Sequence, residues 1–329
     1  MSAHHHQGRT GFIAVALGVA LAAGGLIGVN SPAWADDGQA QADQTANAIA
    51  AAAPDTGVVA PQAVGDAFAA TSAGTKVTLP DAATGVVTIA PAAPQAGTSA
   101  KPVTVSLPRG AANAPAKKAK NGTVVYPTAN ASAATAAAQV LADGSVRMST
   151  VLNSAKSPQS FTYAIGGATP QLQPDGSVDL VQTTTGDGYT LVQTVGHIAP
   201  AWAKDAAGRP VATHYTVTGN QLVQVVSPDQ GAKYPIVADP QIEKHWYGTY
   251  MYLNKTETNR FMFGANLSAV VGGAVALAGI PQAAALSVVG GLYASVAGLA
   301  QGGGGCLELY WPPLTNLPVP MTYYGGYCR

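Results

Sequence analysis

One long segment without charge constrains the fold of this chain more than any other feature. From Phe261 to Leu307 the sequence contains no Asp, Glu, Lys or Arg over 47 residues. A Gly-Ile-Pro tripeptide at 279–281 interrupts the segment and leaves two apolar arms, 261–279 and 282–300, of 19 residues each. Roughly 20 apolar helical residues cross the hydrocarbon core of a bilayer. The arms therefore predict a helical hairpin that is either buried in protein or inserted in lipid.

We place the two helices of this hairpin at 254–279 and 281–300. Asn254 can cap the first helix, with Glu257 three residues later returning a hydrogen bond. Pro281 suits the first turn of the second helix. Small residues recur on one face of each arm, and such a stripe lets two helices pack closely. They are Gly264, Ser268, Gly272 and Ala276 in the first arm and Ser287, Gly291, Ala294 and Gly298 in the second.

Two interpretations of the hairpin stay open at this point. In the first it inserts into a membrane, as the hairpins of bacteriocin-like and pore-forming proteins do. In the second the arms are core helices, covered by the segment that follows them. The glycines and polar residues within the arms lower their affinity for lipid. In the other direction, soluble helices usually carry a charged face, and these arms have none.

The N-terminus has the pattern of a secretory signal peptide. Arg9 precedes an apolar stretch at 12–29, and a small-x-small Ala-Trp-Ala triplet follows. We therefore expect residues 1–35 to be removed by cleavage between Ala35 and Asp36, and the protein to be secreted or held in the cell envelope. Because the apolar stretch is somewhat long, an uncleaved anchor is the alternative.

Export makes the two cysteines informative. Cys306 and Cys328 both lie near the C-terminus, and an oxidising compartment would join them. Closing a loop of about 22 residues contributes roughly 3 kcal/mol to stability in the chain-entropy model. Neither cysteine has a His or Cys neighbour at zinc-ligand spacing, so we predict no metal site.

Between the two ends, composition divides the chain again. Residues 36–74 are rich in Ala, Gln, Thr, Pro and Gly and predict a flexible lead, with a transient helix over 39–53. From 75 to 240, short Val-, Thr-, Ile- and Tyr-rich runs alternate with turn dipeptides. This spacing is typical of an antiparallel β-sandwich, jelly-roll-like in arrangement. We expect strands at 76–79, 85–89, 102–107, 123–126, 189–195, 214–218, 221–226 and 234–237.

Two units inside this region resemble each other. Each of the segments 141–152 and 172–183 places Asp-Gly-Ser-Val between a short apolar entry and an alternating exit. Asp-Gly is favoured in two-residue hairpin turns, because both central residues there need a positive φ. We therefore predict two similar hairpins with such turns.

The module at 241–329 ends in an aromatic tail. Alternating residues at 307–311 and 323–327 predict two short strands, joined through a Pro-rich turn and closed by the disulfide. The Tyr and Trp side chains there fit three roles: a belt at a membrane interface, a small carbohydrate-stacking face, or cover for a small core. The whole chain is thus expected to be α+β and multi-modular, with a sandwich, a helical hairpin and a β-tail.

Parts of the chain resemble a group of secreted actinobacterial proteins of unknown function. The matching residues are the segment 199–217, the Tyr-Pro-x-x-x-Asp-Pro strand at 234–240, and the C-terminal module from Leu-Asn-Lys-Thr-Glu-Thr to Gly-Gly-Tyr-Cys-Arg. The resemblance covers roughly 123–329. It implies export and a β-sandwich, and it assigns no catalytic residue.

The sequence favours an exported, non-enzymatic interaction or structural protein. Net charge is zero and charged residues make up 10%, which disfavours nucleic-acid binding. No nucleophile elbow, phosphate loop, zinc motif or dinucleotide fingerprint is present, so we predict no catalytic residue and no cofactor. The expected partner is a cell-envelope component, a membrane lipid or another protein. The alternatives are a membrane-active effector carried in the hairpin and, less favoured, a secreted carbohydrate-active enzyme.

Overall fold

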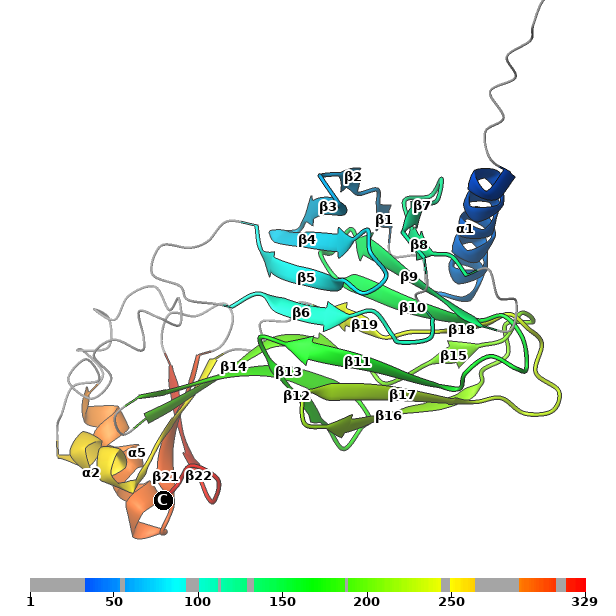
Figure 1. The fold of residues 1–329 in the computed structure, drawn as a ribbon. Coiled ribbons are helices and arrows are strands. Elements are labelled where there is room, and N and C mark those ends of the chain that lie inside the picture. The colour runs from blue at the N-terminus through cyan, green and yellow to red at the C-terminus, as the bar shows by residue number, and fades with distance from the viewer. Residues whose placement is uncertain are drawn as a thin grey trace, which may run out of the picture.

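The computed structural model describes the chain in separate stretches. They are residues 33–53, 57–92, 101–111, 114–128, 133–186, 189–243, 249–263, 290–311 and 318–329. Within these stretches the protein is mainly antiparallel β-sheet with three helices, α1 (Ala33–Ala52), α2 (Lys255–Met262) and α5 (Gly290–Gly302). Two sheets face each other as a sandwich (Figure 1). The predicted antiparallel sandwich is confirmed, and its jelly-roll-like arrangement stays a prediction.

The larger sheet has 14 strands in the described stretches, and its main path runs β22-β21-β20-β14-β19-β10-β9-β8-β7. Its strands are β1 (Val58–Val59), β7 (Lys117–Lys118), β8 (Val124–Tyr126), β9 (Ala134–Leu141), β10 (Val146–Leu152), β12 (Thr169–Leu172), β13 (Val178–Gly186), β14 (Tyr189–Ile198), β15 (Ala203–Lys204), β18 (Ile236–Ala238), β19 (Gln241–Glu243), β20 (Thr249–Leu253), β21 (Cys306–Trp311) and β22 (Val319–Tyr323).

The smaller sheet has 8 strands in the same stretches, in the order β16-β17-β11-β6-β5-β4-β3-β2. Its strands are β2 (Gln62–Ala63), β3 (Ala67–Ser72), β4 (Thr75–Pro80), β5 (Val86–Pro91), β6 (Val103–Ser106), β11 (Ser160–Gly166), β16 (Ala212–Thr218) and β17 (Gln221–Ser227). Each strand expected between residues 76 and 237 therefore has a counterpart in one of the two sheets.

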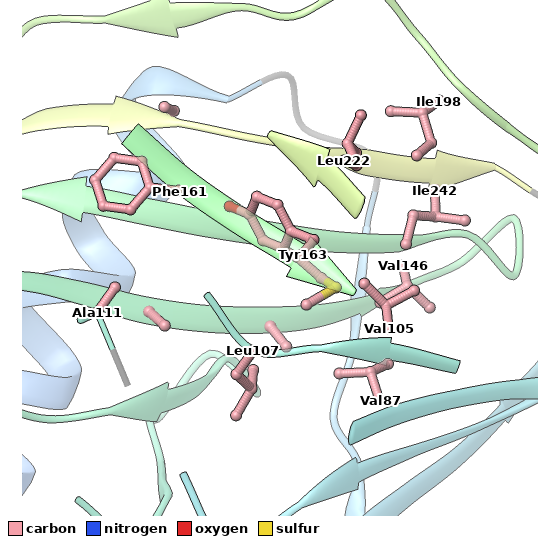
Figure 2. Packing of buried hydrophobic residues seen from close by; sticks show 14 of the residues in the cluster. Val87, Val105, Leu107, Ala111, Val146, Phe161, Tyr163, Ile198, Leu222 and Ile242 are labelled. Carbon is pink, nitrogen blue, oxygen red and sulfur yellow. The ribbon is translucent and has the colours of Figure 1, made fainter. Parts of the chain in front are cut away.

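The main hydrophobic core lies between the two sheets (Figure 2). Phe161 and Tyr163 of β11 enter it from the smaller sheet, as does Leu222 of β17, and Val146 of β10 enters it from the larger sheet. All four side chains are fully buried. Burying one such side chain contributes about 1.5–3 kcal/mol, so this shared layer holds the two sheets together.

Helix α1 packs on the larger sheet, which corrects the prediction of a flexible lead at 36–74 (Figure 1). Ala42, Ala46 and Ile49 follow one another at helical spacing and are buried. Alanine is the strongest helix former, and its small side chain lets the helix approach the sheet closely. Because the stripe contains few large apolar side chains, composition alone does not indicate it. The helix covers Val125, Ala137, Val151 and Val237 of the sheet.

The rest of the expected lead also belongs to the sheets. Val58 of β1 pairs with Leu141 of β9, and β2 and β3 form the edge of the smaller sheet. These strands are short or contain much alanine, so their sequence alone carries only a weak strand pattern. β1 gains its structure from a strand far along the chain, whereas β2 and β3 form through antiparallel pairing that leads to the adjacent strand β4.

The two Asp-Gly hairpins are confirmed, but their turns are longer than predicted. Gly144 and Gly176 have φ of 84° and 87°, whereas neither Asp143 nor Asp175 has a positive φ. The backbone N–H and the hydroxyl of Ser145 both donate to Asp143 Oδ1, at 2.9 and 2.6 Å. The backbone N–H and the hydroxyl of Ser177 donate to Asp175 Oδ1 in the same way. The aspartate side chain thus bridges a three-residue loop in which only glycine needs the left-handed conformation.

At the C-terminal end, β20 extends the larger sheet by pairing with β14 and with β21. Helices α2 and α5 cover one face of this extension (Figure 1). Met251, Leu253, Leu307 and Leu309 point to that face and are fully buried. A second, smaller core therefore lies under the two helices.

The predicted hairpin is described only at its two ends, because residues 264–289 lie outside the described stretches. The single first helix predicted over 254–279 is wrong, because α2 ends at Met262 with Phe263 as its C-cap. At those ends α2 packs on α5, with the rings of Phe261 and Tyr293 edge to face at 6.4 Å. Asn254 caps α2 as predicted, with its side chain accepting from Glu257 N at 2.8 Å. The carboxylate of Glu257 instead binds Arg260. In the described part of the chain, no helix combines the length and the apolar character that a membrane crossing needs.

Candidate binding face

The C-terminal sheet carries a group of tyrosines on the face turned away from α2 and α5. We call this group the tyrosine face. Side chains alternate along a strand, so when Met251 and Leu309 point to the helices, their neighbours point outward. The tyrosine face consists of Tyr250 and Tyr252 on β20, Tyr310 on β21, Tyr323 on β22, and Tyr327 after β22.

Strand register brings the five rings into one contiguous group. Tyr250 pairs directly with Tyr310 across β20 and β21, and their rings stack with centroids 4.7 Å apart. The rings of Tyr252 and Tyr323 meet edge to face with centroids 4.9 Å apart. The ring of Tyr327 lies tilted to that of Tyr252, with centroids 5.6 Å apart. Each of the five side chains is half-buried or exposed. The result is a contiguous aromatic surface that is partly open to solvent.

Glu308 lies inside this aromatic surface. It pairs with Tyr252 across β20 and β21 and is half-buried. Desolvation raises the pKa of its carboxyl. Desolvation, together with the charge of Glu308, also raises the pKa of Tyr252 to about 12. Both groups thus sit in surroundings drier than open solvent, where a hydrogen bond to a ligand is stronger than in water.

A pocket of about 420 Å³ adjoins the tyrosine face. Tyr252 and Tyr327 line it, together with Thr190, Asn254 and Arg329. These last three residues supply a hydroxyl, an amide and a guanidinium beside flat aromatic surface. A small-molecule site usually combines apolar walls with a small number of polar groups.

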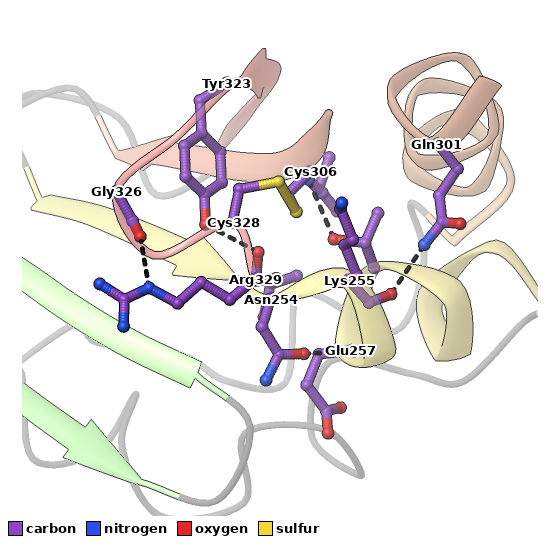
Figure 3. Close-up of a disulfide and its surroundings, with 12 residues drawn as sticks. Asn254, Lys255, Glu257, Gln301, Cys306, Tyr323, Gly326, Cys328 and Arg329 are labelled. Carbon is purple, nitrogen blue, oxygen red and sulfur yellow. Dashed lines mark hydrogen bonds between the residues drawn. A yellow bond between two sulfur atoms is a disulfide. The ribbon is translucent and has the colours of Figure 1, made fainter. Parts of the chain in front are cut away.

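The disulfide holds the last part of the tyrosine face in place (Figure 3). Cys306 and Cys328 are joined, with Cα atoms 5.6 Å apart, as the sequence predicted. Cys306 lies on β21 opposite Tyr323. The bridge therefore fixes Tyr327, one residue before Cys328, next to Tyr252. The hydroxyl of Tyr323 donates to Leu253 O at 2.9 Å and fastens the same region to β20.

Most of the hairpin packing residues predicted from sequence lie outside the described stretches, namely Gly264, Ser268, Gly272, Ala276 and Ser287. Gly291, Ala294 and Gly298 belong to α5.

The buried stripe of α5 is Tyr293, Ala297 and Ala300, next to the predicted positions. At Gly298 an added Cβ would lie 3.6 Å from Met262 Sδ, so this glycine does face α2. Ala35 and Asp36 fall within the first turn of α1, and cleavage between them stays a prediction.

Sequence reasoning missed the burial of Asp239. It follows β18 in the Tyr-Pro-x-x-x-Asp-Pro segment and is 1% exposed. Burial raises its pKa to about 7, although a bond from Trp202 N and the nearby Arg147 both act to lower it. The position within a strand motif was visible in the sequence, but the burial of the carboxyl was not.

The described stretches contain no group of three or more His, Cys, Asp and Glu side chains placed to hold a metal ion. Nδ1 of His197 lies 2.8 Å from Asp179 Oδ1, and His214 is exposed on β16. His245 lies outside those stretches.

Comparisons of the chain with family models, curated proteins and solved structures found no match.

Proposed function

We propose that this is an exported, non-enzymatic interaction protein that binds a glycan of the cell envelope through its tyrosine face. The observation that carries the proposal is the gathering of five tyrosine rings on the outward face of a sheet whose other face is fully used by the core. A tyrosine that only covers a core would point toward α2 and α5. These rings point away and form a contiguous aromatic surface that is partly exposed to solvent.

A glycan suits this surface chemically. A pyranose ring has a flat C–H face that packs on an aromatic ring, and hydroxyls at its edge that need hydrogen-bond partners. Glu308 can accept such bonds within the tyrosine face. Asn254 and Arg329 can donate them at the adjoining pocket. Tyrosine combines a large apolar area with a polar tip, which is why it is enriched at binding surfaces.

Binding without hydrolysis is the favoured version of the proposal. Most glycosidases use two carboxyl groups roughly 5–10 Å apart across the sugar. Among the described residues, the tyrosine face carries a single carboxyl, that of Glu308. A carbohydrate-active enzyme is therefore the weaker reading of the same surface.

Export is part of the proposal and has three supports. The disulfide between Cys306 and Cys328 forms and persists in oxidising compartments. The N-terminal pattern is that of a signal peptide, with cleavage proposed after Ala35. The resemblance to secreted actinobacterial proteins points to the same location.

The experiment is a co-sedimentation assay of the purified protein with insoluble peptidoglycan, chitin and cellulose. We expect saturable binding to peptidoglycan, weakened on the order of tenfold by Tyr252→Ala or Tyr310→Ala, because aromatic anchors dominate binding surfaces. The control is Leu172→Ala, which removes an apolar side chain that is 46% exposed elsewhere. Binding to none of the three polymers, or equal loss in the control, would contradict the proposal.

A membrane-active effector is the second candidate. The observation that favours it is the packing of α2 on α5, since this holds the two ends of the uncharged segment together as a helical hairpin requires. Gln301 Nε2 also donates to Lys255 O at 2.7 Å between the two helices (Figure 3). We propose that the uncharged segment between α2, which ends at Met262, and α5 completes this hairpin. Dye release from liposomes by sub-micromolar protein would place this function first, and failure to associate with liposomes would remove it.

A further inference from the structure

Strands β6 and β11 of the smaller sheet stay paired at only one end. Their register joins Ile165 with Val105 and Gly166 with Thr104. One position further, Ala164 N no longer finds a backbone carbonyl of β6 and donates to Ser106 Oγ at 2.8 Å. Strand β6 ends there. The remaining residues of β11 therefore have no strand beside them on that side.

Two hydrogen bonds fix the direction of the backbone groups of β11. Val226 N donates to Gln159 O, and Ile165 N donates to Asn220 O, both at 2.8 Å. Backbone groups of alternate residues point to opposite neighbours in an antiparallel sheet. The odd-numbered residues of β11 thus bond to β17, whereas Ser160 and Thr162 direct their N–H and C=O groups toward the vacated side.

These groups face a slot of about 680 Å³. Ser160, Thr162 and Ala164 line it from β11, and Ser106, Leu107 and Arg109 are among its other lining residues. Arg109 is exposed and forms no ion pair with any described residue. It is also the sole charged residue of this lining. The slot therefore offers a row of backbone donors and acceptors with a positive charge beside it.

We propose that this slot binds an extended peptide that carries a carboxylate and adds a strand to β11. Added strands gain affinity from main-chain hydrogen bonds, and Ser160 and Thr162 present such groups at the spacing of a strand. From Ser160 to Ala164 the edge is roughly 14 Å long, which matches a segment of about five residues. Arg109 supplies the charge complement for an acidic side chain or a free C-terminus. This site is separate from the tyrosine face and is tested independently of it.

The first measurement needs no ligand. Native-state hydrogen exchange followed by NMR should show fast exchange of the Ser160 and Thr162 amides and slow exchange of the Phe161 and Tyr163 amides. Protection of the Thr162 amide in the free protein would overturn the proposal, because the edge would then already be occupied.

The second measurement uses a pool of synthetic hexapeptides with alternating β-branched residues and free C-termini. We expect pool members to shift the amide resonances of Ser160 and Thr162. Thr162→Pro removes the N–H on the open side without touching a bond to β17, and prolines are tolerated at such edges. It should weaken binding at least tenfold, whereas Thr162→Val, which keeps the N–H, should change it less than twofold. Arg109→Ala should weaken binding of free-acid peptides and leave their amidated forms unchanged.

Absence of shifts at these amides across the pool, or equal binding by the Pro and Val variants, would overturn the proposal. Unchanged exchange at Phe161 and Tyr163 in each variant shows that β11 is still folded.

Discussion

The hydroxyl oxygens of Tyr163 and Thr150 lie 2.9 Å apart in the centre of the sandwich. Tyr163 comes from β11 of the smaller sheet and Thr150 from β10 of the larger one, and both are fully buried. Away from water, each hydroxyl depends on the other for its hydrogen bond. The pair therefore fixes the position of the two sheets relative to each other through a polar contact within an apolar layer.

Removing one member of this pair should destabilise the protein more than removing both. Tyr163→Phe leaves the Thr150 hydroxyl buried without its partner, which costs about 1–3 kcal/mol. Combining it with Thr150→Val should recover part of that loss. Urea unfolding of the single and double variants measures the coupling. Thr216→Val, at an exposed position on β16, is the control and should stay within about 0.5 kcal/mol of the parent. Purely additive effects would contradict the account.

Asp239 should make the stability of the protein fall as pH rises. Burial raises its folded pKa from the ordinary 3.8 to about 7, so between these values the folded state binds more protons than the unfolded state. Stability is then lost with increasing pH, by at most about 1.4 kcal/mol per pH unit. Asp239→Asn should remove this part of the slope. Urea unfolding from pH 4.5 to 8 tests the prediction, and an unchanged slope in the variant would refute it.

Truncating the side chain of Ile49 should loosen α1 from the larger sheet. Ile49 is fully buried against the sheet, so Ile49→Ala should lower the free energy of unfolding by about 2–5 kcal/mol. Limited proteolysis should also cut the segment after α1 sooner. Gln44→Ala, on the exposed side of the same helix, is the matched control. Similar behaviour of the two variants would mean that α1 does not depend on this contact.

The disulfide should matter for both stability and binding. Replacing Cys306 and Cys328 by alanine should cost about 3 kcal/mol in the chain-entropy model, measured by calorimetry against the oxidised parent. Because the bridge fixes Tyr327 beside Tyr252, glycan binding should weaken as well. A reducing agent should reproduce both effects in the parent and change nothing in the double variant. Equal stability of parent and variant would contradict the assigned role of the bridge.

Much of the local structure could be predicted from the sequence. Alternating residues such as those at 76–79 and 189–195 predicted strands, because a half-buried strand needs that pattern. The export pattern and the cysteine count predicted the disulfide. Helix α1 was underestimated, because its buried stripe consists largely of alanines whose burial depends on a sheet formed later in the chain.

The tyrosine face could be anticipated only as one of three roles for aromatic residues. The tyrosine face forms because of the register of β20 against β14 and β21, which pairs Tyr252 with Thr190 and with Glu308. Such pairings join residues more than 50 positions apart, and local sequence pattern does not encode them. The same limit applies to the slot beside β11, because its position depends on where β6 ends.

An NMR titration of protein carrying ¹³C-labelled tyrosine rings, with soluble fragments released from peptidoglycan, tests the central claim most directly. The account predicts saturable shifts for Tyr250, Tyr252, Tyr310 and Tyr327, with no change for Tyr126 and Tyr163 in the core. Absence of any shift at saturating fragment, or shifts confined to tyrosines away from the C-terminal sheet, would contradict it.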